Sequence, residues 1–268
     1  MKKIVLVSLT ILISSGFLTL ATHAQPKRAD TELVPRFILE RMLREWKSIE
    51  DYQAVITLTE RRADRGTDRF SIFLQVVQDV NPSGTPQNTL RMNVYDRPIP
   101  SDPKQAAEIE NATPMEIYFI NPLQHFYHYQ ARTQTVTIDL IQENNALPQF
   151  LKLAGFLTLD LAELEKRVQL DRKAELVEQE GKELYRIMIE PRADYAPVAP
   201  NRFVWIERDT NLPYKFLQDG DQLTQTFIIE DYVTNQGIRA DSLTPMLPAN
   251  TQPIDLRPER RRVRPATP

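Results

Sequence analysis

Apolar and polar residues alternate along most of the chain from Tyr52 to Tyr232, which is the pattern of strands that bury one face. In the first of these segments Tyr52, Ala54 and Ile56 share one parity. The same period of two recurs at 69–78, 90–95, 115–120, 125–129, 134–140, 172–179, 183–190, 202–207, 213–218 and 224–232. The pattern predicts about eleven strands, and the lack of a helix after each strand favours an antiparallel sheet.

Two segments have helical spacing instead. Glu32–Ile49 predicts an amphipathic helix, and Leu147–Val168 predicts two short amphipathic pieces joined around Thr158. The predicted fold class is α+β, mainly β: a strongly curved antiparallel sheet of about eleven strands, an incomplete half-barrel, with an N-terminal helix and central lid helices on its concave face. The lid is either a cover that a ligand displaces or a fixed layer that completes the core.

Proline and glycine mark the connections between the strands. Asp79–Thr89 and Asp96–Pro114 are rich in proline and predict long loops, with a helical turn within Asp102–Glu110. Glu180–Gly181 and Asp219–Gly220 predict hairpin turns, because glycine adopts the positive φ that tight turns require. We expect one domain over residues 30–240.

The N-terminus has the pattern of a secretory signal peptide over residues 1–24. Lys2 and Lys3 precede an apolar run that ends in small residues, so we expect cleavage near Ala24 and a soluble periplasmic chain. A membrane anchor is the alternative, but Gly16 and several serines interrupt the run. The chain contains no cysteine, which excludes disulfides, thiol nucleophiles and a lipid anchor on cysteine.

Charge is balanced along the chain, with a formal net charge of −3 and both signs interspersed. This composition argues against nucleic-acid binding. Residues 245–268 differ, because they are rich in proline and arginine and cannot bury a core. They predict a disordered tail, which is either simply solvated or an electrostatic tether to anionic lipid.

The sequence predicts no catalytic, cofactor-binding or metal-binding residue. His125 and His128 are three apart on a predicted strand and therefore point to opposite faces. Glu175, Glu178 and Glu180 lie among basic residues on a predicted solvated hairpin. Neither a Gly-x-Ser-x-Gly elbow nor a phosphate-binding loop occurs. The pattern favours binding over catalysis.

Large apolar side chains on the predicted strands and lid are candidates for a hydrophobic cavity. For each of them, plain core packing is the alternative. The candidate ligand-binding residues are Met92, Met115, Phe119, Tyr127, Tyr129, Ile138, Phe150, Leu153, Phe156, Leu157, Ile187, Trp205, Phe216 and Ile229.

Three segments have a recognisable family pattern. They are Phe203–Pro213, with a strand, an acidic turn and Leu-Pro; Phe227–Ile238, which ends in Asn-Gln-Gly-Ile; and Tyr129 with Val136-Thr137. On these segments the chain resembles the LolA/LolB-like superfamily of periplasmic lipoprotein-binding half-barrels, including its less characterised LolA-like branch. The long predicted loops and the basic tail depart from the family pattern.

The resemblance implies a monomeric carrier that binds the acyl chains of a lipoprotein or lipid without a covalent bond, for transport or as a chaperone. One alternative is an RseB-like envelope sensor whose partner is an inner- or outer-membrane protein. A regulatory interaction module, with a filled concave face and the tail as its contact, is the other. None of these three functions needs a cofactor or nucleic acid.

Overall fold

The computed structural model describes residues 33–80, 86–109, 113–140, 165, 168–192 and 201–257. The helices in these ranges are α1 (Pro35–Lys47), α2 (Pro103–Ala107) and the 3₁₀ turn η2 (Ala240–Leu243). The strands are β1 (Asp51–Arg62), β2 (Gly66–Val80), β3 (Pro86–Tyr95), β4 (Glu116–Ile120), β5 (His125–Gln130), β6 (Thr135–Leu140), β7 (Val168–Leu170), β8 (Glu175–Gln179), β9 (Lys182–Pro191), β10 (Asn201–Glu207), β11 (Pro213–Asp219), β12 (Leu223–Thr234) and β13 (Gln252–Asp255).

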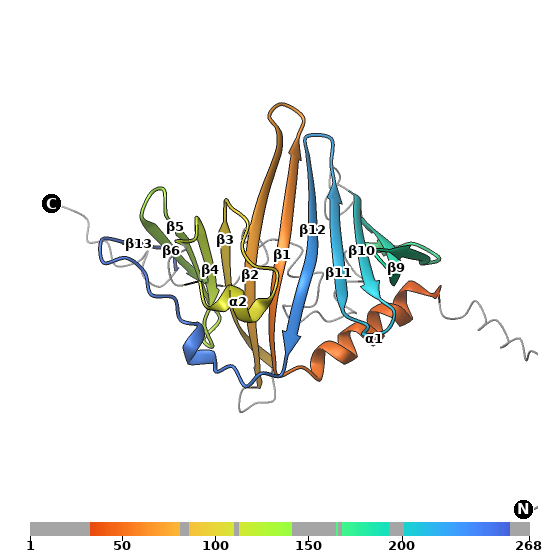
Figure 1. Ribbon diagram of the computed structural model, residues 1–268, viewed down its shortest axis with the longest axis horizontal. Helices are drawn as coiled ribbons and strands as arrows, with labels where there is room; N and C mark the ends of the chain where they lie inside the picture. Colours follow the sequence, from red (N-terminus) through yellow and green to blue (C-terminus); the bar gives the residue numbers. More distant parts are fainter. Residues whose placement is uncertain are drawn as a thin grey trace, which may run out of the picture. The chain divides into compact units, whose positions relative to one another are not determined.

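All the described strands belong to one open sheet, in the order β13-β6-β5-β4-β3-β2-β1-β12-β11-β10-β9-β7, with β8 also paired to β9 (Figure 1). The predicted fold class, mainly β with a curved open sheet, is confirmed. The strand count differs, since the sheet has 13 strands. The pairings are antiparallel except that of β13 with β6, which is parallel.

Helix α1 forms at the predicted place. Pro35 occupies its first turn, where a missing N–H is tolerated. Arg44 and Lys47 lie in its last turn, where their positive charges interact favourably with the negative end of the helix dipole. Ile38, Met42 and Trp46 recur at helical spacing and are buried. The rings of Trp46 and Tyr52 pack edge to face with their centroids 5.2 Å apart, and this contact joins α1 to β1.

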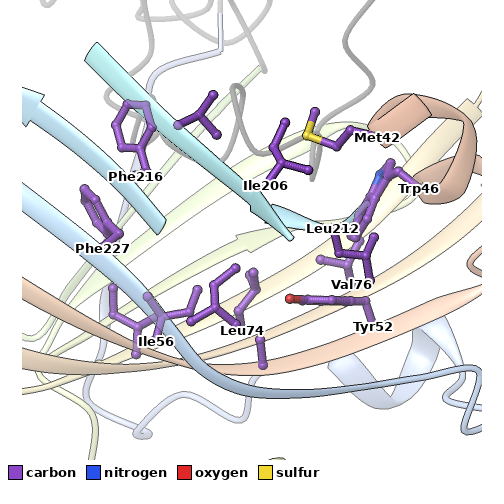
Figure 2. Close-up of a cluster of buried hydrophobic side chains, with 14 of the residues drawn as sticks. Met42, Trp46, Tyr52, Ile56, Leu74, Val76, Ile206, Leu212, Phe216 and Phe227 are labelled. Carbon is purple, nitrogen blue, oxygen red and sulfur yellow. The ribbon is translucent and has the colours of Figure 1, made fainter. Parts of the chain in front are cut away.

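Cross-strand neighbours share a face, so the register defines two faces of the sheet. We call the side that packs on α1 the helix face. It contains one large cluster that spans the sheet, including Leu90 of β3, Ile56 of β1 and Ile189 of β9. Figure 2 shows part of this cluster. In Figure 2, Met42 and Trp46 approach the cluster from α1, and Phe216 and Phe227 lie on neighbouring strands.

The other side, the opposite face, has smaller clusters. Val55, Phe73 and Tyr95 pack with Ala106 of α2, which lies beside β2 and β3 in Figure 1. Further clusters contain Ile117, Tyr129 and Val136, and Leu184, Trp205 and Tyr214. The helix face therefore holds the main core.

The C-terminal segment 239–257, which we call the strap, corrects the prediction of a disordered tail from residue 245. Leu247 packs on the Ile117 cluster, and the Gln252 N–H donates to the carbonyl of Gln134 at 2.8 Å. The prediction of disorder is wrong through residue 257, because an apolar contact and strand pairing order the chain despite its prolines. Residues 258–268 lie outside the described residues.

The loop prediction is also wrong at Asp79–Thr89, where β2 continues to Val80 and β3 begins at Pro86. The ladder between these strands explains the difference, since Val77 pairs with Thr89 and Asp79 with Gln87. The predicted helical turn after Asp102 is confirmed by α2. The Asp102 side chain caps its first turn by accepting a hydrogen bond from the Lys104 N–H at 2.8 Å.

Candidate ligand-binding face

The helix face contains a continuous apolar row that follows the cross-strand register. It runs across six strands, from β9 to β2, and no polar residue interrupts it. Its members are Ile187, Val204, Phe216, Phe227, Leu58 and Phe70. A second row on the same face consists of Ile229, Ile56, Ile72 and Val94.

This apolar surface is larger than α1 can cover. Twelve strands spaced by about 4.8 Å span roughly 50 Å along the sheet, whereas a helix of 13 residues is about 20 Å long. The sequence predicts that Leu147–Val168 covers the remainder. Its candidate residues Phe150, Leu153, Phe156 and Leu157 lie outside the described residues.

One residue near the end of that segment is described. The carboxylate of Glu165 lies 3.4 Å from Nε of Arg36 on α1, and the same nitrogen lies 3.1 Å from Glu40. These exposed pairs contribute little stability, since surface ion pairs are typically worth less than about 1 kcal/mol. They do place Glu165 beside α1.

The register divides the candidate residues between the two faces. Met92, Ile187, Phe216 and Ile229 belong to the helix-face cluster, and Met115 packs against it. Phe119 pairs with Arg91 and Tyr127, and Trp205 pairs with Arg186 and Lys215, so both lie on the opposite face. The prediction of one shared lining is wrong for five residues: Phe119, Tyr127, Tyr129, Ile138 and Trp205.

A polar row borders the apolar row of the helix face, one step closer to the tips of the β1–β2 and β11–β12 hairpins. Its members are Arg202, Gln218, Gln225, Glu60 and Asp68. Glu60 accepts hydrogen bonds from Arg62 at 3.0 Å and Gln225 at 2.6 Å. The helix face is therefore amphipathic along its strands, with apolar rows that end at polar side chains.

A second polar group on this face joins β4 and β5. The Tyr118 hydroxyl donates to Oε2 of Glu116 at 2.5 Å, and Nε2 of His128 lies 3.2 Å from the same oxygen. The hydrogen bond to His128, more than that from Tyr118, lowers the pKa of Glu116, although burial opposes the shift. Burial, followed by the bond to Glu116, raises the pKa of Tyr118.

The sequence did not predict this Glu116 group. The sequence did predict that the two histidines point to opposite faces. The structure confirms this, because His125 and His128 are three residues apart on one regular strand and pair with Leu140 and Thr137 of β6. The signal that could have revealed this group is the pairing of Tyr118 with His128, whose stacked ring centroids are 4.3 Å apart. That pairing is known only once the register of β4 on β5 is known.

Two pockets lie on the opposite face among the described residues. One, of about 420 Å³, lies between β4–β6 and the strap and is lined mainly by apolar and aromatic side chains, including Phe119, Tyr127 and Leu247. Leu123 beside it is 73% exposed and Met246 is 96% exposed, so large apolar groups flank this pocket. The other, of about 380 Å³, is lined by both polar and apolar side chains, among them Arg69, Arg97 and Ile99.

The described ranges contain no group of three histidine or acidic side chains positioned to hold a metal ion. None of the helices in those ranges combines the length and apolar character that crossing a bilayer requires.

No family model matches the chain, and no curated protein matches it. Solved structures similar to it include an uncharacterised conserved protein from Thermus thermophilus, at 12% identity, a TM-score of 0.49, and coverage of 82% of this chain and 98% of that chain. A putative outer membrane lipoprotein-sorting protein domain from Vibrio parahaemolyticus has 9% identity, a TM-score of 0.40 and coverage of 81% and 97%. A LolA superfamily protein from Nitrosomonas europaea has 8% identity, a TM-score of 0.33 and coverage of 77% and 97%. The similar structures thus include the group that the sequence resembles, but likenesses of this degree carry no function across.

Proposed function

We propose that this protein is an exported, periplasmic carrier that binds the acyl chains of a lipoprotein or lipid on its helix face. The observation that supports this most is the apolar row from Ile187 to Phe70, on a face too wide for α1 alone. The sequence resemblance to the LolA/LolB-like superfamily points to the same class of ligand. The residues that we assign to the ligand on this face are Met92, Met115, Ile187, Phe216 and Ile229.

The energetics favour a site of this kind. A chain with a dozen methylenes gains on the order of 10 kcal/mol when it leaves water, at about 0.8 kcal/mol for each methylene. Such a gain needs an apolar surface that extends over several strands, because a methylene chain of this length is longer than one side chain is wide. The apolar row crosses six strands and meets this requirement.

Entry of a ligand requires a cover that moves. We propose that Leu147–Val168 is this lid and that Phe150 and Phe156 occupy the place of the acyl chain when no ligand is bound. The pair Arg36–Glu165 would then act as a contact between the end of the lid and α1. We also propose that residues 1–24 are a cleaved signal peptide.

Mass spectrometry of the protein purified from its native envelope tests the proposal. After lipid extraction, we expect one acylated lipid or lipoprotein for each protein chain. The matched control is protein that has been unfolded in urea, washed free of lipid and refolded, which should take up a fluorescent fatty acid. A native preparation without cargo, together with a refolded protein that takes up no fatty acid, would contradict the proposal.

The pocket on the opposite face favours a second function, that of an envelope sensor or interaction module. Leu123 and Met246 beside it are too exposed to serve the core of this chain and suit contact with an apolar segment of a membrane protein. A double variant Leu123→Ser and Met246→Ser separates the two functions. Loss of a co-purified membrane protein with unchanged lipid content supports the sensor, whereas loss of lipid content contradicts it.

A further inference from the structure

Arg202 of β10 is a partly buried cation whose Nε has no hydrogen-bond acceptor among the described residues. It lies in the polar row of the helix face, between Ile189 of β9 and Gln218 of β11. Its Nε is fully buried and has no hydrogen-bond partner. Burial lowers the pKa of Arg202, and no carboxylate opposes that shift.

Two other arginines in the described ranges also have a buried Nε without a hydrogen bond, but each has another partner. The guanidinium of Arg41 lies over the ring of Tyr185, 5.5 Å from its centroid. Arg186 lies over Phe203 at 4.5 Å and donates from Nη1 to Glu175 at 2.8 Å. Among the described arginines with a buried, unbonded Nε, Arg202 is therefore the one that has neither a cation–π contact with an aromatic ring nor an ion pair with a carboxylate.

The nearest acid of the polar row is already engaged. Glu60 accepts from Arg62 and Gln225, and the register places it three strands away from Arg202, about 14 Å between backbones. A buried guanidinium N–H without an acceptor is unfavourable, and the planar fork of the group matches a carboxylate or phosphate. Arg202 thus suits an anion that arrives from outside the chain.

We infer that Arg202, together with Gln218, binds the anionic head group of an amphiphile whose acyl chain lies on the apolar row. This inference rests on the proposed function and adds the ligand's charge and orientation. Val204 follows Arg202 by two residues on the same face, so the apolar row begins about 7 Å from the arginine. A head group at Arg202 would direct the chain toward Val204 and Phe216.

The test compares three amphiphiles with the same chain length: palmitate, hexadecyl phosphate and hexadecanol. Their affinities are measured by displacement of a fluorescent fatty acid from the full mature chain. The variants are Arg202→Gln, which removes the charge, Arg202→Lys, which keeps it, and Arg132→Gln, a matched loss of charge at an exposed turn. Circular dichroism and thermal melting confirm that each variant is folded.

We expect wild-type protein to bind at least one of the two anions roughly tenfold more tightly than hexadecanol. Arg202→Gln should lose this preference without weaker binding of hexadecanol, Arg202→Lys should retain part of it, and Arg132→Gln should retain all of it. The anion that binds more tightly identifies a carboxylate or a phosphate as the head group.

Two results would overturn the inference. If Arg202→Gln weakens all three ligands equally, or keeps the preference for anions, Arg202 does not bind the head group, while acyl binding itself still stands. If wild-type protein binds none of the three, the proposed function fails and this inference fails with it.

Discussion

The backbone N–H of Gly237 donates to the carboxylate of Asp51 at 2.8 Å, so the segment after β12 is fixed to the first residue of β1. The N–H groups of Gln236 and Ile238 donate to the same carboxylate at 2.9 and 3.1 Å. In return, the side chain of Asn235 accepts from the Glu50 N–H at 2.8 Å. Asp51 is 2% exposed, and the strap begins directly after this junction.

Replacing Asp51 with alanine should lower the free energy of unfolding by about 3 kcal/mol, because three N–H groups lose a charged acceptor in a buried place. Urea denaturation measures the effect. Asp241→Ala is the control, since this aspartate pairs with Arg239 on the solvent-exposed surface and its loss should change the free energy of unfolding far less. Equal effects of the two substitutions would contradict the structural role of Asp51.

Acid should weaken the fold through Glu116. Hydrogen bonds, chiefly with His128, lower its pKa in the folded state, so the charged form stabilises the fold above the usual carboxyl pKa of 4.5. This contribution is lost as the pH falls below that value toward the lowered pKa. As the pH falls below 4.5, wild-type protein should lose stability more steeply than Glu116→Gln, as thermal melting at each pH would show. Parallel curves would show that Glu116 does not contribute.

The regular elements could be predicted from the sequence because their signals are local. The hairpin at Glu180–Gly181 is an example: the two residues have φ values of 54° and 76°, as a tight turn between β8 and β9 requires. Strand β13 gave no such signal. It has four residues, includes Pro253 and forms only by pairing with β6, which is distant in sequence.

The face of each strand was harder to predict than the strand itself. In β4, Phe119 and Ile120 are adjacent and both buried, so alternation does not show which of them faces the core. The same holds for Val204 and Trp205 of β10. Only the register distinguishes these faces, since it aligns Val204 with Ile187 and Trp205 with Arg186. For this reason the candidate site included residues from both faces.

Lid residues should govern ligand uptake. The double variant Phe150→Asp and Phe156→Asp should bind a fluorescent fatty acid at least tenfold more weakly, because two charges would enter the apolar environment of the acyl chain. Phe37→Asp on α1 is the matched control, since Phe37 is 54% exposed and does not face the core. Unchanged uptake by the double variant would show that Leu147–Val168 is not the lid.

The strap should protect an edge of the sheet. In the parallel pairing of β13 with β6, the N–H groups of Gln252 and Leu256 point toward β6. The backbone nitrogen of Pro253 therefore points away from β6, toward the free edge. Because proline has no N–H, this edge offers an incoming strand one donor fewer. A chain that ends at Asn250 should self-associate more than the full chain, measured by light scattering. Ile254→Ser keeps the backbone pairing and should not. A truncated chain with unchanged mass would contradict this role.

Photocrosslinking is the most direct measurement of acyl binding on the helix face. The protein is loaded with a palmitate analogue that carries a diazirine near the end of its chain, irradiated and digested, and the labelled residues are identified by mass spectrometry. We predict labels on helix-face residues such as Met92, Phe216 and Ile229, and their loss when excess palmitate competes. Labels confined to Phe119, Tyr127 and the strap, or labels that palmitate does not reduce, would contradict the account.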